Sequence, residues 1–241
     1  MMLGARTGAW TKSGGGTPTA RDYVQDGLVA MWDGIENAGW GVHDPNATVW
    51  KDLVGEFDLT INLNAFFSQY GLCSDDNSFV TKGIAYRDET IPQDKVKTIE
   101  ICTRIDKPNG SPNYKNNAWI FVLNDRLSSG STNLCVIIRK RSDEGMMRTA
   151  ISSSPMERDY LPHYYVVTKD VGFLDGKELS SIKYTNDYNN GNCFCLFGRD
   201  GTTYYQPGAG MIYRCAIYSR ALTSSEIAAN YAIDKERFNL P

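Results

Sequence analysis

The chain has 241 residues, of which 41% are hydrophobic and 12% aromatic, enough for one large domain with a sizeable core. Its formal net charge of −3 gives no electrostatic reason to expect a nucleic acid partner. No apolar run approaches the ~20 residues of a membrane-spanning helix, so we expect no membrane span. Residues 1–10 lack the apolar core of a conventional signal peptide, which leaves export by another route or assembly into a larger particle open.

Residues 1–22 are small, polar and rich in glycine, with Ser-Gly-Gly-Gly-Thr-Pro at positions 13–18. A segment of this composition buries little surface, which predicts a flexible N-terminal arm followed by one folded domain over residues 23–241. Trp10 is the one aromatic side chain of the arm and is suited to binding another surface. A disordered tail and an arm that docks on a neighbouring subunit are therefore the two interpretations of this segment.

From residue 27 onward, short strand-like runs alternate with turn pairs. The runs cover residues 28–32, 98–105, 118–123, 135–138, 164–168, 171–174, 193–197 and 211–218. Asn-Gly or Asp-Gly pairs, typical of hairpin turns, stand at positions 109–110, 175–176, 190–191 and 200–201. Within 98–105, three isoleucines and a threonine alternate with polar residues, which predicts a half-buried strand. Many short strands and one helix predict an all-β sandwich.

The helix is expected at the C-terminal end, directly after the apolar run 211–218. Thr223 and Glu226 have the spacing of a capping box, and Leu222 and Ile227 have that of a hydrophobic staple. An alanine-rich turn follows, which favours a short helix.

Three segments, in this order, resemble parts of one family. The first joins Asp-Gly-Leu-Val-Ala-Met-Trp-Asp-Gly at 26–34 to Thr-Val-Trp-Lys-Asp-Leu-Val-Gly at 48–55. The second, at 165–178, reads as a strand followed by another that ends in Asp-Gly-Lys-Glu, and the third is the closing strand and helix at 208–231. Together they resemble laminin-G-like domains of the concanavalin A-like lectin–glucanase superfamily. The resemblance implies a two-sheet antiparallel jelly-roll β-sandwich with one short C-terminal helix.

The amino-acid sequence of residues 26–45 is also similar to that of such domains in gut bacteria and their phages or prophages. This similarity implies a non-enzymatic lectin-like module that binds carbohydrate or another surface. Its place would be a virion or the bacterial cell surface, and its partner a glycan or bacterial surface polysaccharide. The alternative is a purely structural capsid or fibre subunit without glycan binding, which contacts copies of itself or virion neighbours through the N-terminal arm.

The six cysteines are expected to be free thiols, because most lie in strand-like apolar runs and no secretory signal accompanies them. They stand at positions 73, 102, 135, 193, 195 and 215. Calcium-binding members of the family carry acidic residues at the start of the last strand, where this chain has Tyr213 and Arg214. An arginine repels Ca²⁺, so no metal or cofactor is predicted. A calcium ion near Asp52 or Asp58 is the alternative that the sequence leaves open.

Glucanases of the same superfamily carry a Glu-x-Asp-x-Glu strand, whose carboxylates act as nucleophile and acid/base. This chain has no such triplet, no Gly-x-Ser-x-Gly motif and only two histidines, His43 and His163. His163 precedes a strand and is expected to be structural. We therefore expect no enzyme activity and no catalytic residue, and keep a glycoside hydrolase as a third and weaker alternative.

Sugar recognition uses an aromatic face for the pyranose ring and planar polar groups for its hydroxyls. Two loops offer this mixture, and their candidate ligand-binding residues are Trp40, His43, Asp44 and Asn46 in the first and Tyr204, Tyr205 and Gln206 in the second. A third loop, at 184–190, is rich in asparagine and tyrosine. The alternative is that Trp40 packs against the edge of the sandwich and that the tyrosines are ordinary surface residues. Trp32, Trp50 and Trp119 are assigned to the core.

Overall fold

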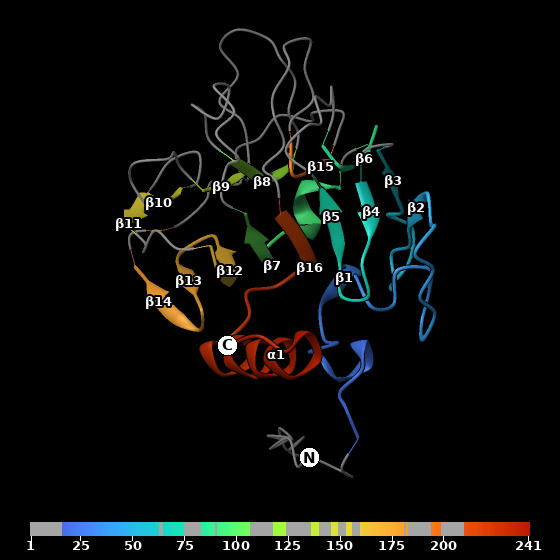
Figure 1. Ribbon diagram of the computed structural model, residues 1–241. Coiled ribbons are helices and arrows are strands. Elements are labelled where there is room, and N and C mark those ends of the chain that lie inside the picture. The colour runs from blue at the N-terminus through green and yellow to red at the C-terminus, as the bar shows by residue number, and fades with distance from the viewer. Residues whose placement is uncertain are drawn as a thin grey trace, which may run out of the picture.

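The computed structural model describes residues 16–62, 65–74, 83–89, 91–106, 118–123, 136–139, 146–148, 153–155, 160–180, 182, 194–198 and 210–241. These residues form two antiparallel sheets packed as a sandwich, with one α-helix at the C-terminal end (Figure 1). The predicted all-β sandwich with a C-terminal helix is therefore confirmed. No helix of the described part is long and apolar enough to cross a membrane.

The first sheet has the order β14-β13-β12-β7-β16-β5-β4, with β1 also paired to β16. Its strands are β1 (Leu28–Asp33), β4 (Ala65–Phe67), β5 (Leu72–Ser74), β7 (Thr98–Ile105), β12 (Pro162–Thr168), β13 (Gly172–Leu174), β14 (Lys177–Leu179) and β16 (Gly210–Tyr218). Strands β1 and β5 follow one another along the same side of β16, because β1 pairs with its second half and β5 with its first. This arrangement brings the end of β1 next to the start of β5.

The second sheet has the order β11-β10-β9-β8-β15-β6-β3-β2. Its strands are β2 (Val49–Trp50), β3 (Leu59–Ile61), β6 (Ala85–Arg87), β8 (Ala118–Leu123), β9 (Val136–Arg139), β10 (Met146–Arg148), β11 (Ser153–Pro155) and β15 (Phe194–Leu196). All eight strand-like runs found in the sequence correspond to strands of one or the other sheet. The strands that the sequence missed are two to three residues long, too short for a periodic pattern.

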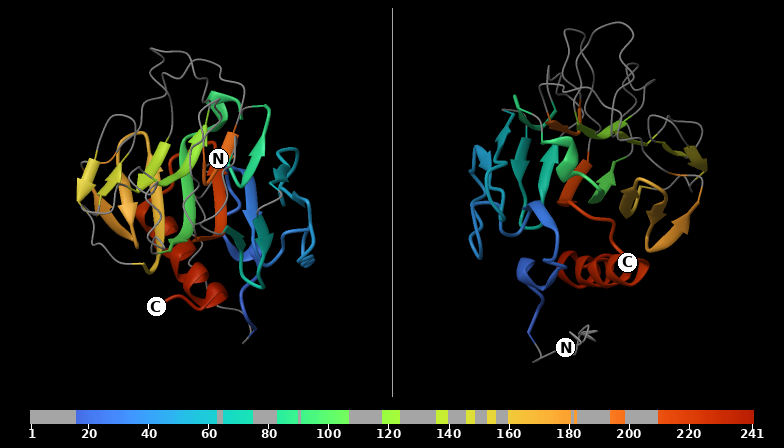
Figure 2. Two further views of the ribbon diagram at one scale, coloured as in Figure 1. Left: turned by 45° about the horizontal axis from the view of Figure 1, so that its top comes forward. Right: turned by 180° about the vertical axis from the view of Figure 1, so that it is seen from behind.

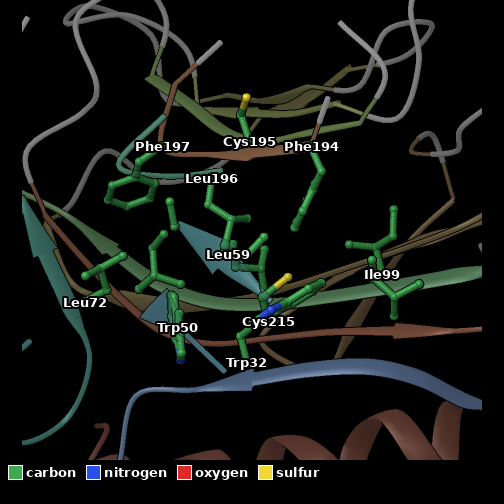
Figure 3. Packing of buried hydrophobic residues seen from close by; sticks show 14 of the residues in the cluster. Trp32, Trp50, Leu59, Leu72, Ile99, Phe194, Cys195, Leu196, Phe197 and Cys215 are labelled. Carbon is green, nitrogen blue, oxygen red and sulfur yellow. The ribbon is translucent and has the colours of Figure 1, made fainter. Parts of the chain in front are cut away.

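The main core fills the space between the two sheets (Figure 3). Trp32 and Trp50 are fully buried there, as predicted from their strand-like surroundings. The Trp32 ring lies 5.1 Å from that of Phe194, and the Trp50 ring meets Phe67 edge-on at 5.3 Å. These contacts join strands of opposite sheets. The side chain of Trp119, also assigned to the core, lies outside the described residues.

Helix α1 (Ser224–Phe238) covers the outer face of the first sheet (Figure 2). The predicted capping box is confirmed, since the Thr223 hydroxyl accepts from the Glu226 N–H while the Glu226 carboxylate accepts from the Thr223 N–H. Leu222 and Ile227 are both buried in the apolar cluster between helix and sheet, as a hydrophobic staple requires. The helix ends at Asn239, whose backbone is left-handed, after 15 residues, so it is longer than expected.

Strand β7 is buried on both faces, whereas its sequence predicted a half-buried strand. Ile99 and Ile101 point into the main core, as expected. Glu100, expected to face water, is fully buried on the opposite face. The reason is α1, which covers this face and supplies partners for the carboxylate.

The N-terminal segment joins the domain at Thr19. A short 3-10 helix, η1 (Ala20–Asp22), follows with its own capping box, and Ala20 is fully buried. Within the predicted arm, Ala20 thus packs on the sandwich together with the following Tyr23, because both join the cluster beneath α1, whereas Arg21 and Asp22 are exposed. Residues 1–15, including Trp10, lie outside the described residues, so the division into arm and domain stays a prediction. The second 3-10 helix is η2 (Gln93–Lys95).

The cysteines of the described part are free and buried, as predicted. They are Cys73, Cys102, Cys195 and Cys215. Burial raises the pKa of the Cys102 thiol well above its usual range and also raises that of Cys73. Cys135 and Cys193 lie outside the described residues.

Candidate ligand-binding site

The first predicted site lies on the loop that follows β1, here called the Trp40 loop (residues 34–46). Asp33, the last residue of β1, starts the loop: its Oδ1 accepts from the N–H groups of Ile35 at 2.9 Å and Glu36 at 3.0 Å. A carboxylate that accepts from the N–H groups two and three residues ahead of it is a common way to turn a chain. The loop therefore has a defined starting direction.

Asn37 closes the base of the Trp40 loop. Its amide donates to the Asp44 carbonyl at 2.7 Å and accepts from the Asp44 N–H at 2.8 Å. The Asn37 carbonyl in turn accepts from the Lys51 N–H at 2.9 Å, which ties the loop to the residue that follows β2. Asn37 is fully buried, and its side chain is matched with both a donor and an acceptor. Hydrogen bonds of Asn37 thus hold the base of the loop in place.

The tip of the Trp40 loop is exposed. The Val42 side chain is 52% exposed, and His43 and Asn46 are exposed beside it. The His43 Nδ1 lies 3.2 Å from the Gly34 carbonyl oxygen, and the Asn46 N–H donates to the Asp44 carboxylate at 2.9 Å. These polar groups stand on an ordered backbone, which is the arrangement that a ligand-binding loop needs.

Trp40 itself is half-buried and packs against the apolar cluster beneath α1. The Arg21 guanidinium lies 4.2 Å from the centre of the Trp40 ring, so a cation covers part of the ring. The ring thus packs on the domain, as the alternative interpretation expected, but it is not fully buried. The assignment of Trp40, His43, Asp44 and Asn46 as ligand-binding residues stays a prediction.

The residues of the second predicted loop, Tyr204, Tyr205 and Gln206, lie outside the described residues, as does the loop at 184–190.

A buried cluster of charged side chains joins the Trp40 loop to η1 and to α1. Arg237 of α1 donates to Asp33 at 2.9 Å and to Glu36 Oε1 at 3.2 Å. Glu36 also accepts from the Ala20 N–H through Oε1 and from the Gly41 N–H through Oε2, each at 2.8 Å. One glutamate thus joins η1, the loop tip and α1. Burial raises the Asp33 pKa to about 6, although the positive charge of Arg237 opposes this shift.

A second buried charge cluster lies at the middle of α1. Arg214 donates to Asp234 through Nε at 2.8 Å and Nη2 at 3.0 Å, and to Glu100 at 3.0 Å. Tyr164 donates to the other Glu100 oxygen, and the Asn230 amide donates to both. Burial raises the Glu100 pKa, while the charge of Arg214 lowers it. Arg214, which stands where calcium-binding members of the family have an acid, is therefore the counter-ion of two buried acids, Glu100 and Asp234.

The acids considered for calcium have hydrogen-bond donors as partners. Asp52 accepts from the N–H groups of Met31 at 2.9 Å, Val54 at 3.0 Å and Phe57 at 3.1 Å. Asp58 accepts from the Asp52 N–H and from the Lys51 ammonium, the latter at 2.6 Å. These carboxylates build the turn after β2. Across the described ranges, no three His, Cys, Asp or Glu side chains gather in a way that could hold a metal ion.

His163 has the structural partner that its position suggested. Its Nδ1 lies 2.7 Å from the Asp175 carboxylate, and the same carboxylate accepts from the Tyr164 N–H at 2.9 Å. Asp175 belongs to the predicted Asp-Gly turn, which connects β13 and β14. The pair thus links β12 to this hairpin.

Sequence reasoning missed the turn between β4 and β5 (residues 68–71), which adjoins the Trp40 loop. Gly34 and Gly71 touch there, because a Cβ on Gly34 would lie 2.4 Å from the Gly71 Cα. Ahead of the turn, Phe66 is 57% exposed, while Phe67 is buried. The signal was present in the sequence: two successive phenylalanines in one strand point to opposite faces, so one of them leaves the core.

No family model and no curated protein sequence matches this chain. Several solved structures, by contrast, are similar to it. Trypanosoma rangeli sialidase in complex with sialic acid has a TM-score of 0.61 and 17% identity, over 90% of this chain and 34% of the sialidase. The same enzyme in complex with the inhibitor DANA gives a TM-score of 0.57 and 17% identity, over 89% of this chain and 33% of the sialidase.

The Ruminococcus gnavus IT-sialidase CBM40 bound to α2,3-sialyllactose is also similar, with a TM-score of 0.45 and 14% identity, over 65% of this chain and 96% of that domain. This chain spans about a third of the length of the sialidases. At these identities, the likeness to the sialidases concerns the fold, a β-sandwich, and not the chemistry.

Proposed function

We propose that this protein is a non-catalytic carbohydrate-binding module of the laminin-G-like type. The observation that carries the proposal is the Trp40 loop, which holds an aromatic ring, His43, Asp44 and Asn46 on a backbone ordered by Asn37 and Glu36. Stacking and hydrogen-bonding groups on a rigid loop are what saccharide recognition uses. The sequence resemblance to lectin-like jelly rolls and the sandwich fold support it.

The absence of catalytic activity is part of the proposal. Two pairs of acids lie where α1 packs on the first sheet in the described part of the chain, Asp33 with Glu36 and Glu100 with Asp234 of α1 itself. Each pair is buried and binds an arginine, Arg237 or Arg214. Glycoside hydrolysis needs a carboxylic acid and a carboxylate that both reach the glycosidic bond. These four acids are buried and each binds an arginine, so they serve the fold.

We place the module on a bacterial surface or a virion, where its partner would be a bacterial polysaccharide. This placement follows from the resemblance of residues 26–45 to domains of gut bacteria and phages. A structural subunit that binds no glycan is the competing function.

Binding of purified bacterial capsular and cell-wall polysaccharides on an array tests the proposal. We expect the wild type to bind at least one of them, and His43→Ala and Asn46→Ala to weaken binding about tenfold, or ~1.4 kcal/mol. Both side chains are exposed, so these variants should fold. Trp40→Ala is a further variant, whose folding is checked by circular dichroism because the ring is half-buried. A wild type that binds no saccharide would exclude the function.

A further inference from the structure

A row of four side chains crosses the outer face of the first sheet beyond the end of α1. Strand pairing places Phe66 of β4 opposite Cys73 of β5, Cys73 opposite Met211 of β16, and Met211 opposite Arg104 of β7. We call this set the Phe66 row. Neighbouring strands lie about 4.8 Å apart, so the row is about 14 Å long. In Figure 1, β4 and β5 lie clear of α1, which covers the other half of the sheet.

The Phe66 end of the row is apolar and open. The Phe66 side chain is 57% exposed, whereas Cys73 and Met211 are each 9% exposed and form the floor of the row. Next to them, the Ser68 hydroxyl lies 3.8 Å from the Met211 sulfur. An aromatic ring that stays exposed on the face of a sheet, beside a closed floor, is a surface on which a flat ring can stack.

The opposite end of the row is ionic but carries no net charge. Arg104 donates to Asp106 through Nε at 2.6 Å and Nη2 at 3.2 Å. The two side chains are 34% and 39% exposed. Tyr213 lies beside them: burial raises its pKa, and the charge of Arg104 partly opposes this effect. The Arg104 guanidinium supplies donors and the Asp106 carboxylate supplies acceptors, and the charges of the two groups cancel.

We propose that the Phe66 row binds an uncharged oligosaccharide, in which one sugar unit stacks on Phe66 and a later unit, at the other end of the ~14 Å row, hydrogen-bonds to Arg104 and Asp106. The inference rests on the proposed carbohydrate-binding function and names the sugar class. A pyranose presents C–H groups on one face for the ring and hydroxyls that both donate and accept, which matches a paired arginine and carboxylate. An acidic sugar gains no net attraction, because Asp106 already compensates Arg104.

The row also adjoins the Trp40 loop. Gly34, the first residue of that loop, touches Gly71, which precedes β5, and the Gly34 N–H donates to the Tyr213 carbonyl at 2.8 Å. A chain of several sugar units can therefore contact the loop and the row together. Because one ligand can contact both places, the substitutions that test the row are made at residues outside the Trp40 loop.

Calorimetry with three neutral probes, cellohexaose, laminarihexaose and chitohexaose, and one anionic probe, 3′-sialyllactose, tests the inference. We expect the wild type to bind at least one neutral probe more tightly than 3′-sialyllactose. Phe66→Ala should weaken that binding about tenfold, and Phe66→Leu should weaken it as much, because leucine keeps apolar bulk but has no flat ring. Arg104→Gln should weaken it several-fold, while Val54→Ala, a change at another exposed apolar side chain, should leave it unchanged.

The possible failures are distinguishable. Neutral binding that Phe66→Ala leaves intact overturns the inference and keeps the proposed function, as does binding of 3′-sialyllactose alone. Binding of no probe and no bacterial polysaccharide overturns both. A wild type that is dimeric in sedimentation and becomes monomeric on Phe66→Ala, without any effect on saccharide binding, identifies the row as a contact between two copies and overturns the inference.

Discussion

Arg214 shows how a single residue can decide whether the sheet and the helix stay together. Its guanidinium is fully buried and bonded to both Glu100 and Asp234, which lie 114 and 20 residues away in the sequence. The Arg214 guanidinium carbon also lies 4.1 Å from the centre of the Tyr23 ring. A buried carboxylate without a counter-ion costs several kcal/mol. The main effect of Arg214 on stability is therefore that it spares Glu100 and Asp234 the cost of being buried without a counter-ion.

Replacing Arg214 by methionine should lower the free energy of unfolding by about 3–5 kcal/mol, because two carboxylates are then left buried without a cation. Urea unfolding at pH 7 measures this. Lys51→Met is the control, since Lys51 pairs with Asp58 at the surface with 50% of its side chain exposed. That pair should be worth about 1 kcal/mol or less. An Arg214→Met loss no larger than the control's would contradict the assignment.

Asp33 gives a pH dependence whose sign can be stated. Burial raises its pKa in the folded protein from 3.8 to about 6. The folded state therefore binds a proton more tightly than the unfolded one between about pH 4 and pH 6. Asp33 contributes most stability below pH 4, and this contribution is lost as the pH rises through 6.

In Asp33→Asn the side chain resembles the protonated acid and does not titrate. The free energy of unfolding of the wild type, minus that of Asp33→Asn, should fall by about 2.4 kcal/mol from pH 4 to pH 7. Urea unfolding of both proteins across this range measures the difference, and other titrating groups cancel in the subtraction. A difference that is constant, or that rises with pH, would rule out the raised pKa.

Among the elements, α1 depends on its first turn. The Thr223 hydroxyl and the Glu226 carboxylate cap each other's N–H groups, and Arg220 holds the same carboxylate at 2.6 Å. Arg220 lowers the Glu226 pKa to about 2, so the box stays ionised at neutral pH. The cap thus fixes the direction in which the chain leaves β16.

Thr223→Ala should cost about 1 kcal/mol of stability, the usual effect of removing an N-cap hydroxyl. Thr223→Ser keeps the hydroxyl and should remain within about 0.5 kcal/mol of the wild type. Thermal unfolding followed by circular dichroism compares the two. Equal losses in both variants would mean that the methyl group, and not the cap, matters.

The elements also show what the sequence can predict. Period-2 patterns and turn pairs located the long strands, and Thr223 with Glu226 located the start of α1. Its length was underestimated because Asp234 and Arg237 look like surface residues until their buried partners are known. The Trp40 loop was proposed as a site from its composition, whereas Phe66 was missed because β4 is only three residues long and no strand was predicted there.

At the scale of the whole molecule, the two ends of the chain close the fold. Leu28 of β1 pairs with Tyr218 of β16, and Tyr23 donates to Asp234 of α1 at 2.6 Å. The Val24 N–H donates to the Asn230 side chain at 3.0 Å. The helix is thus bound to segments more than 200 residues away, and the outer face of the first sheet is completed by the last part of the chain.

A chain that ends at residue 222 should therefore fail to form a stable monomer. It keeps every strand but loses Asp234 and Asn230, so Arg214 and Glu100 face solvent while Tyr164 and Ala216 become an open apolar surface. We expect the cooperative thermal transition to be lost and larger species to appear in sedimentation. A chain that lacks only Pro241, an exposed residue, is the matched control and should unfold like the full chain. If the chain ending at 222 stayed monomeric with an unchanged midpoint, the sandwich would be independent of α1, and the buried charges beneath the helix would serve something other than its attachment.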